Sequence, residues 1–592
     1  MGEDEGAERP ADEGLDFDQP AGVFTMLTPV TPAAVTKRDR ARSADSDSSD
    51  DGLERGAKRS RWRFRPEMRG QYPLAPSTLD GLMSWASQYA RRLDVLGVVK
   101  TLVKNVCRGI NLLTDFSGYG CAEQAAVHVE EGLVFLGHGV ERGFRCIRAC
   151  DAAQVPRQAL LMPTNIEAQE QASPCHIFKN VMATLPASLK SELERIHRWY
   201  CCQREKLLQD GSKPGGDAVS ILGRSLVNAL KERLDEHDVS CNDTADCVKH
   251  GRACKFFGEP GEAWSDGISM WIAGSVCVDY SAMGKRRGVF GEYILPLVVW
   301  LHLAARMLPD VLIHECAPRF PVWILELFLP QYKFLHKVWC PTDGGVPAAR
   351  PRCYSIAICT TTMIPSGVTD IFTAEKFEEI FFRQCTSTAD VFLFLEPTEV
   401  ETSLRRRACQ RGLVLADHAS ESLSREAVMC PSHLARLDAY KRVCRSRGCK
   451  GPWTANLQQS PDSTMALTHG KLPVVTCSSQ LYSIERDRYL EKREVMASFL
   501  LPVHTWSPAW FEGPRRVFQR AAILDELSFH AAKSLVGNGM SLIQVGAAIM
   551  FALCTHVKRA AEQEAAPPLS PAQQASTACV SPSLWTVGES EI

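Results

Sequence analysis

Short apolar runs alternate with longer apolar-periodic segments between about Met68 and Thr360. Runs of strand length that end in turn residues predict buried strands, while apolar residues repeated every three to four positions predict helices. We expect strands at residues 111–116, 144–151, 269–280, 310–316 and 352–358, with helices between them, for example at 294–308 and 321–332. This alternation is typical of an α/β fold, in which a parallel sheet is wrapped by helices.

The pattern loses its regularity after about Thr361 and regains it at Leu472. The irregular stretch, residues 361–470, indicates a second and smaller domain. The last regular segment ends in an apolar-periodic helix that follows a Gly-Asn-Gly turn at 537–539. No internal repeat is visible. We therefore expect one main α/β domain, one irregular domain and a final segment of regular structure.

Both ends of the chain are poor in residues that build a core. Residues 1–66 carry two basic clusters separated by an acidic serine run, which predicts a disordered arm. This arm is either a merely solvated tail, a nuclear-import signal or a segment that contacts phosphates. Residues 557–592, rich in Ala, Pro, Ser and Gln, are also expected to be disordered.

The composition narrows the class of protein. The 592 residues are 45% hydrophobic and 23% charged, which provides enough apolar surface for a sizeable core. The formal net charge of -2 excludes a global basic field, so any nucleic-acid surface must be local. The 23 cysteines are scattered and no secretory signal is apparent, so we expect an intracellular protein that is not secreted. The longest apolar runs are shorter than the roughly 18 residues of a membrane span, so no membrane segment is expected.

A glycine-rich segment follows the first predicted strand. Gly118 and Gly120 would form a tight turn behind Phe116, between this strand and a helix. Such a turn is either ordinary or brings the backbone and a helix N-terminus close to a ligand. Asp151 ends the next strand, where nucleotide-binding sheets hold ribose hydroxyls; it is alternatively a helix cap.

A cysteine loop follows the strand near residue 273. Cys277 lies at the carboxyl end of this strand, and four polar residues follow it in the loop: Ser281, Lys285, Arg286 and Arg287. Cations beside a strand-end thiol lower the thiol pKa and attract phosphate. The alternatives are an inert buried thiol and a solvated basic loop.

Two further polar segments stand at strand ends. Glu315 directly follows a buried strand and is either a cap or a carboxylate held against a substrate. Arg350 and Arg352 have the same parity, so they point to one side if the backbone is extended.

Two cysteine-histidine groups have the ligand types of a structural zinc site. The first lies in an insertion at about 185–268 and comprises Cys241, Cys247, His250 and Cys254; the second comprises Cys430, His433, Cys444 and Cys449. Neither group has the paired CxxC spacing that is usual for zinc. The sequence therefore predicts no metal, and the first group is the stronger candidate.

The order of these segments resembles the cytosine-5 DNA methyltransferase family, which depends on S-adenosylmethionine. That family's motifs run DxFxGxGG, PCQxFSxxGxxxG, ENV, QxRxR, a variable target-recognition region, RxLTxRE and GN. The counterparts in this chain are DFSGYGCAE, SVCVDYSAMGKRRG, HECAP, VPAARPR, DRYLEKRE and VGNGMSLIQVGAAI, and they span about residues 108–554. The chain resembles a divergent member of the family.

The divergence falls at specific positions. Val276 and Val278 replace the proline and glutamine that flank the family's nucleophile, and Cys316 replaces the asparagine of ENV. Further departures are Ala348 for the glutamine of QxRxR, Cys121 for a glycine, Asn180 for the acid expected near adenine, and Asp115 one place after the usual acid. The cysteine, the glutamate and both arginines match the motifs.

The resemblance implies a fold, an activity and a set of site residues. It implies a Rossmann-like class I methyltransferase sheet with a smaller irregular target-recognition domain. Cys277 would add to carbon 6 of a flipped cytosine in duplex DNA, with Glu315, Arg350 and Arg352 completing the catalytic set. The residues implied for S-adenosylmethionine are Phe116, Gly118, Gly120, Asp151, Ala152, Asn180 and Asn538; those implied for nucleic acid are Ser281, Lys285, Arg286 and Arg287.

The same resemblance divides the chain. After the arm at 1–66, it implies a catalytic domain at 67–360, a target-recognition region at 361–470, catalytic motifs that return at 471–556 and the tail at 557–592. A nuclear location is expected from the basic arm, and no membrane partner is expected. The motifs do not choose between DNA and RNA. An RNA methyltransferase, and a catalytically weak relative that binds nucleic acid or chromatin, are therefore the alternatives.

Overall fold

The computed structural model describes most of the chain between residues 72 and 559. The described residues are 72–161, 174–209, 216–237, 243–259, 261–281, 284–367, 371–412, 428–448, 451–461, 463, 466–503 and 527–559. The arm expected at 1–66, almost all of the tail expected at 557–592, and the zinc candidates Cys241 and Cys449 lie outside them.

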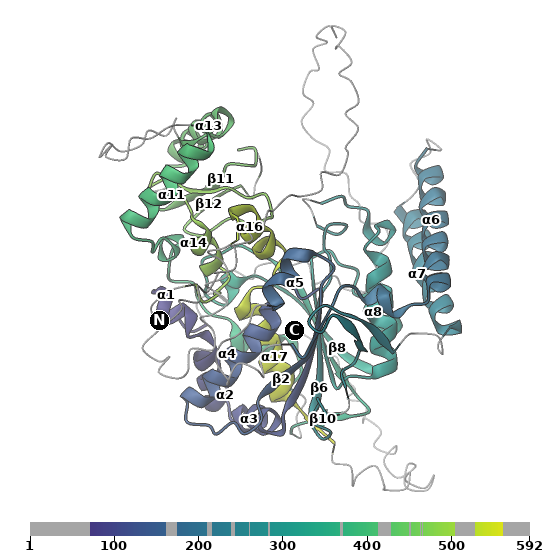
Figure 1. Cartoon of the computed structure of the whole chain (residues 1–592). Coiled ribbons are helices and arrows are strands. Elements are labelled where there is room, and N and C mark those ends of the chain that lie inside the picture. Colours follow the sequence, from purple (N-terminus) through teal and green to yellow (C-terminus); the bar gives the residue numbers. More distant parts are fainter. Residues whose placement is uncertain are drawn as a thin grey trace, which may run out of the picture. The chain divides into compact units, whose positions relative to one another are not determined.

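A nine-stranded sheet forms the centre of the described structure, in the order β5-β4-β3-β2-β1-β6-β7-β9-β8 (Figure 1). Its strands are β1 (Ile110–Asp115), β2 (Phe144–Cys150), β3 (His176–Phe178), β4 (Thr244–Cys247), β5 (Arg252–Lys255), β6 (Ile268–Gly274), β7 (Val311–Cys316), β8 (Tyr332–Trp339) and β9 (Arg352–Cys359). The run from β3 through β2, β1 and β6 to β7 is parallel, and the remaining pairs are antiparallel. The Rossmann-like fold is confirmed, although the sheet is mixed rather than purely parallel. The expected strands are also found, but the one expected at 269–280 ends at Gly274, so Cys277 lies in the loop that follows it.

The strand order reverses between β1 and β6. From β1 the chain proceeds outward through β2 and β3, and then returns to build β6 and β7 on the other side of β1. In open α/β sheets, a ligand crevice forms at such a switch point, outside the carboxyl ends of the strands. The turns that follow β1, β6 and β7 therefore determine where a site can form.

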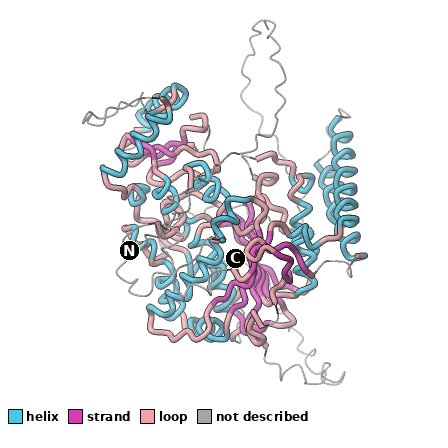
Figure 2. The backbone as a smooth tube through the Cα atoms, viewed as in Figure 1, coloured by secondary structure: helices cyan, strands magenta, loops and turns pink. Residues whose placement is uncertain are grey.

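Helices cover both faces of the sheet, as Figure 2 shows. One apolar core holds α2 (Trp85–Val95), α3 (Val99–Arg108), α4 (Cys121–Phe135) and α17 (Leu542–Thr555); the other holds α6 (Ala187–Gln209), α7 (Gly216–Glu236), α8 (Ile294–Met307) and α9 (Trp323–Phe328). Strand β6 shows the division, since Met270 and Ile272 belong to the first core and Trp271 and Ala273 to the second. Alternate residues of a strand face opposite sides, so a strand that is apolar throughout is buried on both faces.

The final helix is the central helix of the first core. The segment Phe529–Thr555, which joins α16 (Phe529–Asn538) to α17, is long and apolar enough to cross a membrane by length and composition, but 94% of its apolar window is buried inside the protein. Gln544 on α17 donates a hydrogen bond to the carbonyl oxygen of Trp339 at 2.9 Å. The apolar residues of this segment are therefore buried within the core of the protein.

The helix expected at 321–332 is shorter than the sequence analysis predicts. Helix α9 ends at Phe328, and β8 begins at Tyr332. Pro330 lies between them, and proline disfavours helical backbone in the residue that precedes it. Leu329 accordingly has φ -125° and ψ 56°. The chain then runs as β8 along β9, from the pair Tyr332 and Cys359 to the pair Trp339 and Arg352.

A four-stranded antiparallel sheet lies in the region between residues 428 and 490. Its order is β12-β11-β13-β14, with β11 (Trp453–Asn456), β12 (Leu467–His469), β13 (Leu481–Ser483) and β14 (Arg488–Tyr489). Helix α13 (Pro431–Arg447) packs on it through Leu437 and Tyr440, which share an apolar cluster with the sheet. The stretch 361–470 is therefore more regular than its sequence indicates, with α10 (Ala374–Phe381) and α11 (Pro397–Gln410) also within it.

Candidate active site

The turn after β1 has the backbone that its glycines allow. Gly118 and Gly120 have φ of 58° and 78°, in the left-handed region, and α4 begins directly afterwards at Cys121. Phe116 also has a positive φ of 52°, which is unfavourable for a residue with a Cβ atom. The turn therefore places open backbone and the first residues of a helix at the carboxyl end of β1.

Asp151 connects this turn to the end of β2. Its carboxylate accepts hydrogen bonds from the backbone N–H groups of Gly118 and Ala153, each at 2.9 Å. Burial raises the pKa of Asp151, and the two N–H groups act in the opposite direction. The carboxylate thus lies at the expected strand end, in contact with the glycine turn. Ala152 is exposed beside it, and its carbonyl oxygen accepts a hydrogen bond from Arg157 at 2.5 Å.

A hollow opens between the β1 turn and the loop that joins α16 to α17. Its empty volume is about 270 Å³, including the open solvent at its mouth. It is lined by Thr114, Asp115, Phe116, Ser117, Cys121, Ala122, Ile272, Gly274, Asn538, Gly539 and Met540. Two residues of the expected cofactor set, Phe116 and Asn538, therefore line the same hollow from opposite ends of the chain. Asn538 is exposed, and its side-chain oxygen accepts a hydrogen bond from the Cys477 thiol at 3.2 Å.

Met540 lines the hollow next to Gly274. A Cβ atom on Gly274 would lie 2.6 Å from Cε of Met540 and 3.3 Å from a carboxylate oxygen of Glu315. Gly274, the last residue of β6, therefore marks the point at which the hollow meets the polar residues of the neighbouring strand ends.

Three of the four expected catalytic residues meet at these strand ends. Cys277 follows β6, and its carbonyl oxygen accepts hydrogen bonds from the backbone N–H groups of Tyr280 and Ser281 at 3.0 and 2.8 Å. Glu315 is the penultimate residue of β7, and its Oε1 atom lies 2.9 Å from Nε of Arg352, the first residue of β9. The antiparallel pairing of β7 with β9 brings these two side chains together.

The prediction of a lowered thiol pKa at Cys277 is wrong. Burial raises the pKa of Cys277 above its ordinary value; Arg352 and Arg350 lower it and Glu315 raises it, but burial has the largest effect. The charges that act on the thiol come from β9 and β7 rather than from the downstream loop. Lys285 forms an ion pair with Glu292 instead, at 3.2 Å.

Burial also raises the pKa of Glu315, and the Arg352 guanidinium acts against this shift. A carboxyl group whose pKa is raised in a dry site can hold a proton more readily near neutral pH.

Arg350, the fourth expected catalytic residue, contacts a different part of the chain. Its guanidinium donates hydrogen bonds to the carbonyl oxygens of Gly537 at 3.0 Å, Gly539 at 2.5 Å and Val475 at 3.3 Å. It also lies over the ring of Phe499, 4.9 Å from the centroid. Arg350 thus holds the turn that borders the hollow, and its charge also lowers the pKa of Cys277.

The remaining residues of the expected set are found in ordinary structural roles. Asn180 caps a short 3-10 helix (Val181–Thr184) by accepting a hydrogen bond from the N–H of Met182 at 3.0 Å. Ser281 contributes backbone hydrogen bonds to the turn after Cys277, and Lys285, Arg286 and Arg287 are exposed on the loop. None of these four loop residues lines the hollow described above.

Sequence reasoning missed two polar pairs near the site. Asp115 forms a fully buried bidentate ion pair with Arg148 at 2.9 and 2.8 Å, and it also accepts a hydrogen bond from Nε1 of Trp271. His314 shares a hydrogen bond of 2.8 Å with Ser275, and burial lowers its pKa to about 3, so it is neutral. The signal for each pair was a charged or titratable residue inside an otherwise apolar strand.

The second zinc candidate does not assemble among its described members. The two ring nitrogens of His433 are within hydrogen-bonding distance of the Tyr489 hydroxyl, at 2.8 Å, and the Gln458 amide, at 3.2 Å. The Cys430 thiol instead faces the Ser432 hydroxyl at 3.2 Å. The imidazole is therefore already occupied by two protein partners.

No protein-family model and no curated protein matches the chain. Solved structures do: the Entamoeba histolytica methyltransferase EhMeth aligns over 75% of this chain and 98% of its own, with 11% identity and a TM-score of 0.33. The S. pombe Dnmt2 methyltransferase aligns over the same shares with 12% identity and a TM-score of 0.32. A mutant of Spodoptera frugiperda DNMT2 aligns over 75% and 99%, with 11% identity and a TM-score of 0.28. With its strand order reversing between β1 and β6, the chain has a Rossmann-like α/β fold.

Proposed function

We propose that the chain transfers a methyl group from S-adenosylmethionine to carbon 5 of cytosine in DNA, through a covalent bond between Cys277 and carbon 6. One observation carries the proposal. Cys277 and the Glu315–Arg352 ion pair meet at neighbouring strand ends, directly beside the hollow between the glycine turn and Met540.

The residues around the hollow fit the methyl donor. A Cβ atom at Gly118 would meet only the Gly539 backbone, 4.0 Å away, so the turn leaves room for a ligand against its backbone. Phe116, Gly118, Gly120 and Asn538 would hold the donor, with Asp151 on its ribose hydroxyls and Ala152 and Asn180 nearby. When bound, S-adenosylmethionine supplies an electrophilic methyl group on a sulfonium centre.

Carbon 5 of cytosine is a poor nucleophile, and the chain's own residues address this. The Cys277 thiol loses its proton to solvent, and the thiolate adds to carbon 6 to form a carbon–sulfur bond. Glu315 hydrogen-bonds ring nitrogen 3 and the exocyclic amine, which stabilises the electron density that shifts towards carbon 5. Arg352 contacts the carbonyl oxygen of the base and favours the thiolate. After carbon 5 accepts the methyl group, it loses its proton to solvent, the carbon–sulfur bond breaks and the thiolate leaves.

A base inside a duplex has carbon 6 within the stack, so the cytosine must be flipped out at a cost of a few kcal/mol. The exposed cations of the cysteine loop, Lys285, Arg286 and Arg287, would contact the flanking phosphates together with Ser281. Their position directly after the nucleophile supports this role.

A nucleic-acid-binding protein without turnover is the second candidate. One observation favours it: burial raises the pKa of the Cys277 thiol. This opposes rapid chemistry without opposing the binding of a nucleic acid.

The test is methyl transfer from labelled S-adenosylmethionine to duplex DNA and, separately, to transfer RNA. We expect label in DNA, its loss in Cys277→Ala, and its retention in the matched Cys409→Ala, whose thiol is exposed elsewhere. Label only in RNA would overturn the DNA substrate, and label that survives Cys277→Ala would overturn the nucleophile. If neither substrate is labelled and DNA binding is intact, methyl transfer is overturned and the second candidate, a nucleic-acid-binding protein without turnover, is supported. DNA that carries 5-fluorocytosine should trap the wild-type chain as a covalent adduct at Cys277.

A further inference from the structure

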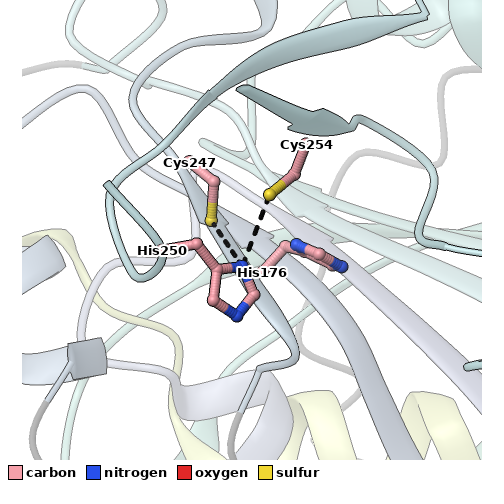
Figure 3. A group of neighbouring side chains, drawn as sticks. All are labelled: His176, Cys247, His250 and Cys254. Carbon is pink, nitrogen blue, oxygen red and sulfur yellow. Dashed lines mark hydrogen bonds between the residues drawn. The ribbon is translucent and has the colours of Figure 1, made fainter. Parts of the chain in front are cut away.

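Four metal-ligating side chains converge where the β4–β5 hairpin joins β3, as Figure 3 shows. His176 begins β3, Cys247 ends β4, Cys254 lies in β5 and His250 lies in the turn between β4 and β5. One ligand atom of each residue lies within 4.8 Å of the others. None of the four lines the hollow described above, so this cluster is separate from the candidate active site.

Strand pairing brings the four residues together. Phe178 of β3 pairs with Cys247, and Ala245 of β4 pairs with Cys254 across the hairpin. Gly251, with φ 63°, completes the tight turn that returns the chain after His250. The hairpin thus directs both thiols towards His176 on the neighbouring strand.

The distances match a tetrahedral metal site. Nδ1 of His250 lies 3.5 Å from Sγ of Cys247 and 3.4 Å from Sγ of Cys254. Zinc binds sulfur at about 2.3 Å and imidazole nitrogen at about 2.0–2.1 Å, so a sulfur and a nitrogen on one tetrahedral ion are about 3.5 Å apart. The two thiols and the His250 imidazole are therefore spaced as three ligands of one ion.

His176 supplies a fourth ligand that already has its supporting partner. Its Nε2 atom faces both carboxylate oxygens of Glu262, at 2.8 and 3.0 Å. Its Nδ1 atom is buried and has no hydrogen-bond partner within the described structure. Histidines that bind metals commonly donate their other ring N–H to a carboxylate, which fixes the tautomer and orients the free nitrogen. Glu262 therefore leaves Nδ1 of His176 as the ligand atom.

We propose that His176, Cys247, His250 and Cys254 bind one zinc ion in a closed structural site. Two thiolates and two imidazoles are a ligand set that selects zinc over the oxygen-preferring cations, and four protein ligands leave no open position for catalysis. The two thiolates balance the charge of the ion, and their two protons are released when it binds.

Zinc at this position would fasten the β4–β5 hairpin to the parallel part of the sheet. The hairpin reaches β3 through few backbone contacts, among them the hydrogen bond from the N–H of Val248 to the carbonyl oxygen of Ile177 at 2.7 Å. Glu262 extends the connection to the segment that leads into β6. The ion would thus hold together two sections of chain that flank the helical part of the insertion.

The first test is the metal content of the full-length chain purified without chelators. We expect inductively coupled plasma mass spectrometry to find one zinc ion per chain. We also expect Co²⁺ to replace zinc with the thiolate charge-transfer and tetrahedral visible bands that a Cys₂His₂ set gives. A chain without zinc that also fails to take up Co²⁺, or a recovered Cys247–Cys254 disulfide peptide, would overturn the proposal.

Variants then identify the ligands. Cys254→Ser and His250→Ala should each lose most of the zinc and have a lower melting temperature. The control is Cys202→Ser, which removes an exposed thiol on α6 and should keep the zinc content and the melting temperature of the wild type. His250 is exposed, so His250→Ala is the variant least prone to fail in folding, and its circular dichroism should match the wild type. Full zinc occupancy in His250→Ala with an unchanged cobalt spectrum would contradict the assignment of this ligand and of the site.

Discussion

At the scale of single residues, burial outweighs neighbouring charge at Cys277. In the sequence, Lys285, Arg286 and Arg287 follow the cysteine closely, which predicts a lowered thiol pKa. The structure shows that desolvation dominates and that the favourable charges belong to Arg352 and Arg350. Sequence proximity identified the thiol but could not identify its partners, because these are brought to it by the pairing of β7 with β9.

Replacement of Arg352 should therefore make Cys277 less reactive. Arg352 is the charge that favours the thiolate most, so Arg352→Gln should raise the thiol pKa further. We expect the pH profile of Cys277 alkylation by iodoacetamide to move to higher pH, with slower alkylation than in the wild type below the pKa. Removal of Arg352 also favours protonation of Glu315. A neutral Glu315 no longer raises the thiol pKa, which offsets part of the expected increase.

Mass spectrometry of the Cys277 peptide across a pH series measures this shift without relying on methylation. Arg319→Gln, at an exposed position shortly after β7, is the control and should leave the profile unchanged. Superimposable profiles for the wild type and Arg352→Gln would contradict the electrostatic role of Arg352.

The buried Asp115–Arg148 pair makes a second prediction at this scale. Asp115→Asn leaves an uncompensated buried guanidinium, which sits 4.1 Å from the centroid of the Phe256 ring. Loss of one partner of a buried pair costs about 3–5 kcal/mol, whereas an exposed pair, screened by solvent, contributes far less. Urea unfolding should show a larger decrease in the free energy of unfolding for Asp115→Asn than for Asp266→Asn, whose partner Arg142 lies at the surface. Equal losses in the two variants would argue against this role for the buried pair.

At the scale of elements, apolar periodicity was sufficient to predict a strand or helix wherever that element is buried along its whole length. The strands near residues 112, 146, 271, 313 and 356 and the helix that follows the Gly-Asn-Gly turn were predicted from it. Strand β8 was missed because YKFLHKVW alternates apolar and polar residues only weakly, and its pairing with β9 rather than its own pattern makes it a strand. A three-residue strand such as β3 is too short to show a period.

Close packing of α17 against α2 gives a prediction for an element. A Cβ atom on Gly546 would overlap the indole ring of Trp85, which is buried in the first core. Helix propensity favours alanine over glycine by about 1 kcal/mol, but overpacking a core costs about 1–3 kcal/mol, so the clash should win. We expect Gly546→Ala to lower the free energy of unfolding, as measured by urea denaturation. Gly139→Ala, where a Cβ would meet nothing within 4 Å, should be near neutral. A stabilised Gly546→Ala would show that α17 and α2 can separate without cost.

At the scale of the whole molecule, the insertion at about 185–268 contacts residues that are distant in sequence, and these contacts cannot be predicted from the sequence alone. The residue types in the insertion identified three described members of its cysteine-histidine group, but His176 lies far upstream and joins them only because β3 pairs with β4. The helical part of the insertion is likewise brought next to the cysteine loop. Arg204 on α6 lies 5.3 Å from the ring centroid of Phe290, and the Cys201 thiol donates to the Phe290 carbonyl oxygen at 3.4 Å.

These contacts predict that the insertion holds the cysteine loop in place. Phe290 belongs to the 3-10 helix Gly288–Phe290 that ends this loop, and it is buried in the second core. Phe290→Ala should lower the free energy of unfolding by about 3–5 kcal/mol. It should also loosen the loop, so that Cys277 becomes less desolvated and is alkylated several-fold faster at neutral pH.

Phe328→Ala separates the loss of stability from the loosening of the loop. Phe328 is buried in the same core, on α9, so its removal should cost a similar free energy of unfolding. It does not belong to the cysteine loop, and the alkylation rate of Cys277 should stay at the wild-type value. If both variants accelerate alkylation equally, the effect reflects general destabilisation. If only Phe290→Ala does, packing around the Phe290 ring, including Arg204 of the insertion, limits the exposure of the nucleophile.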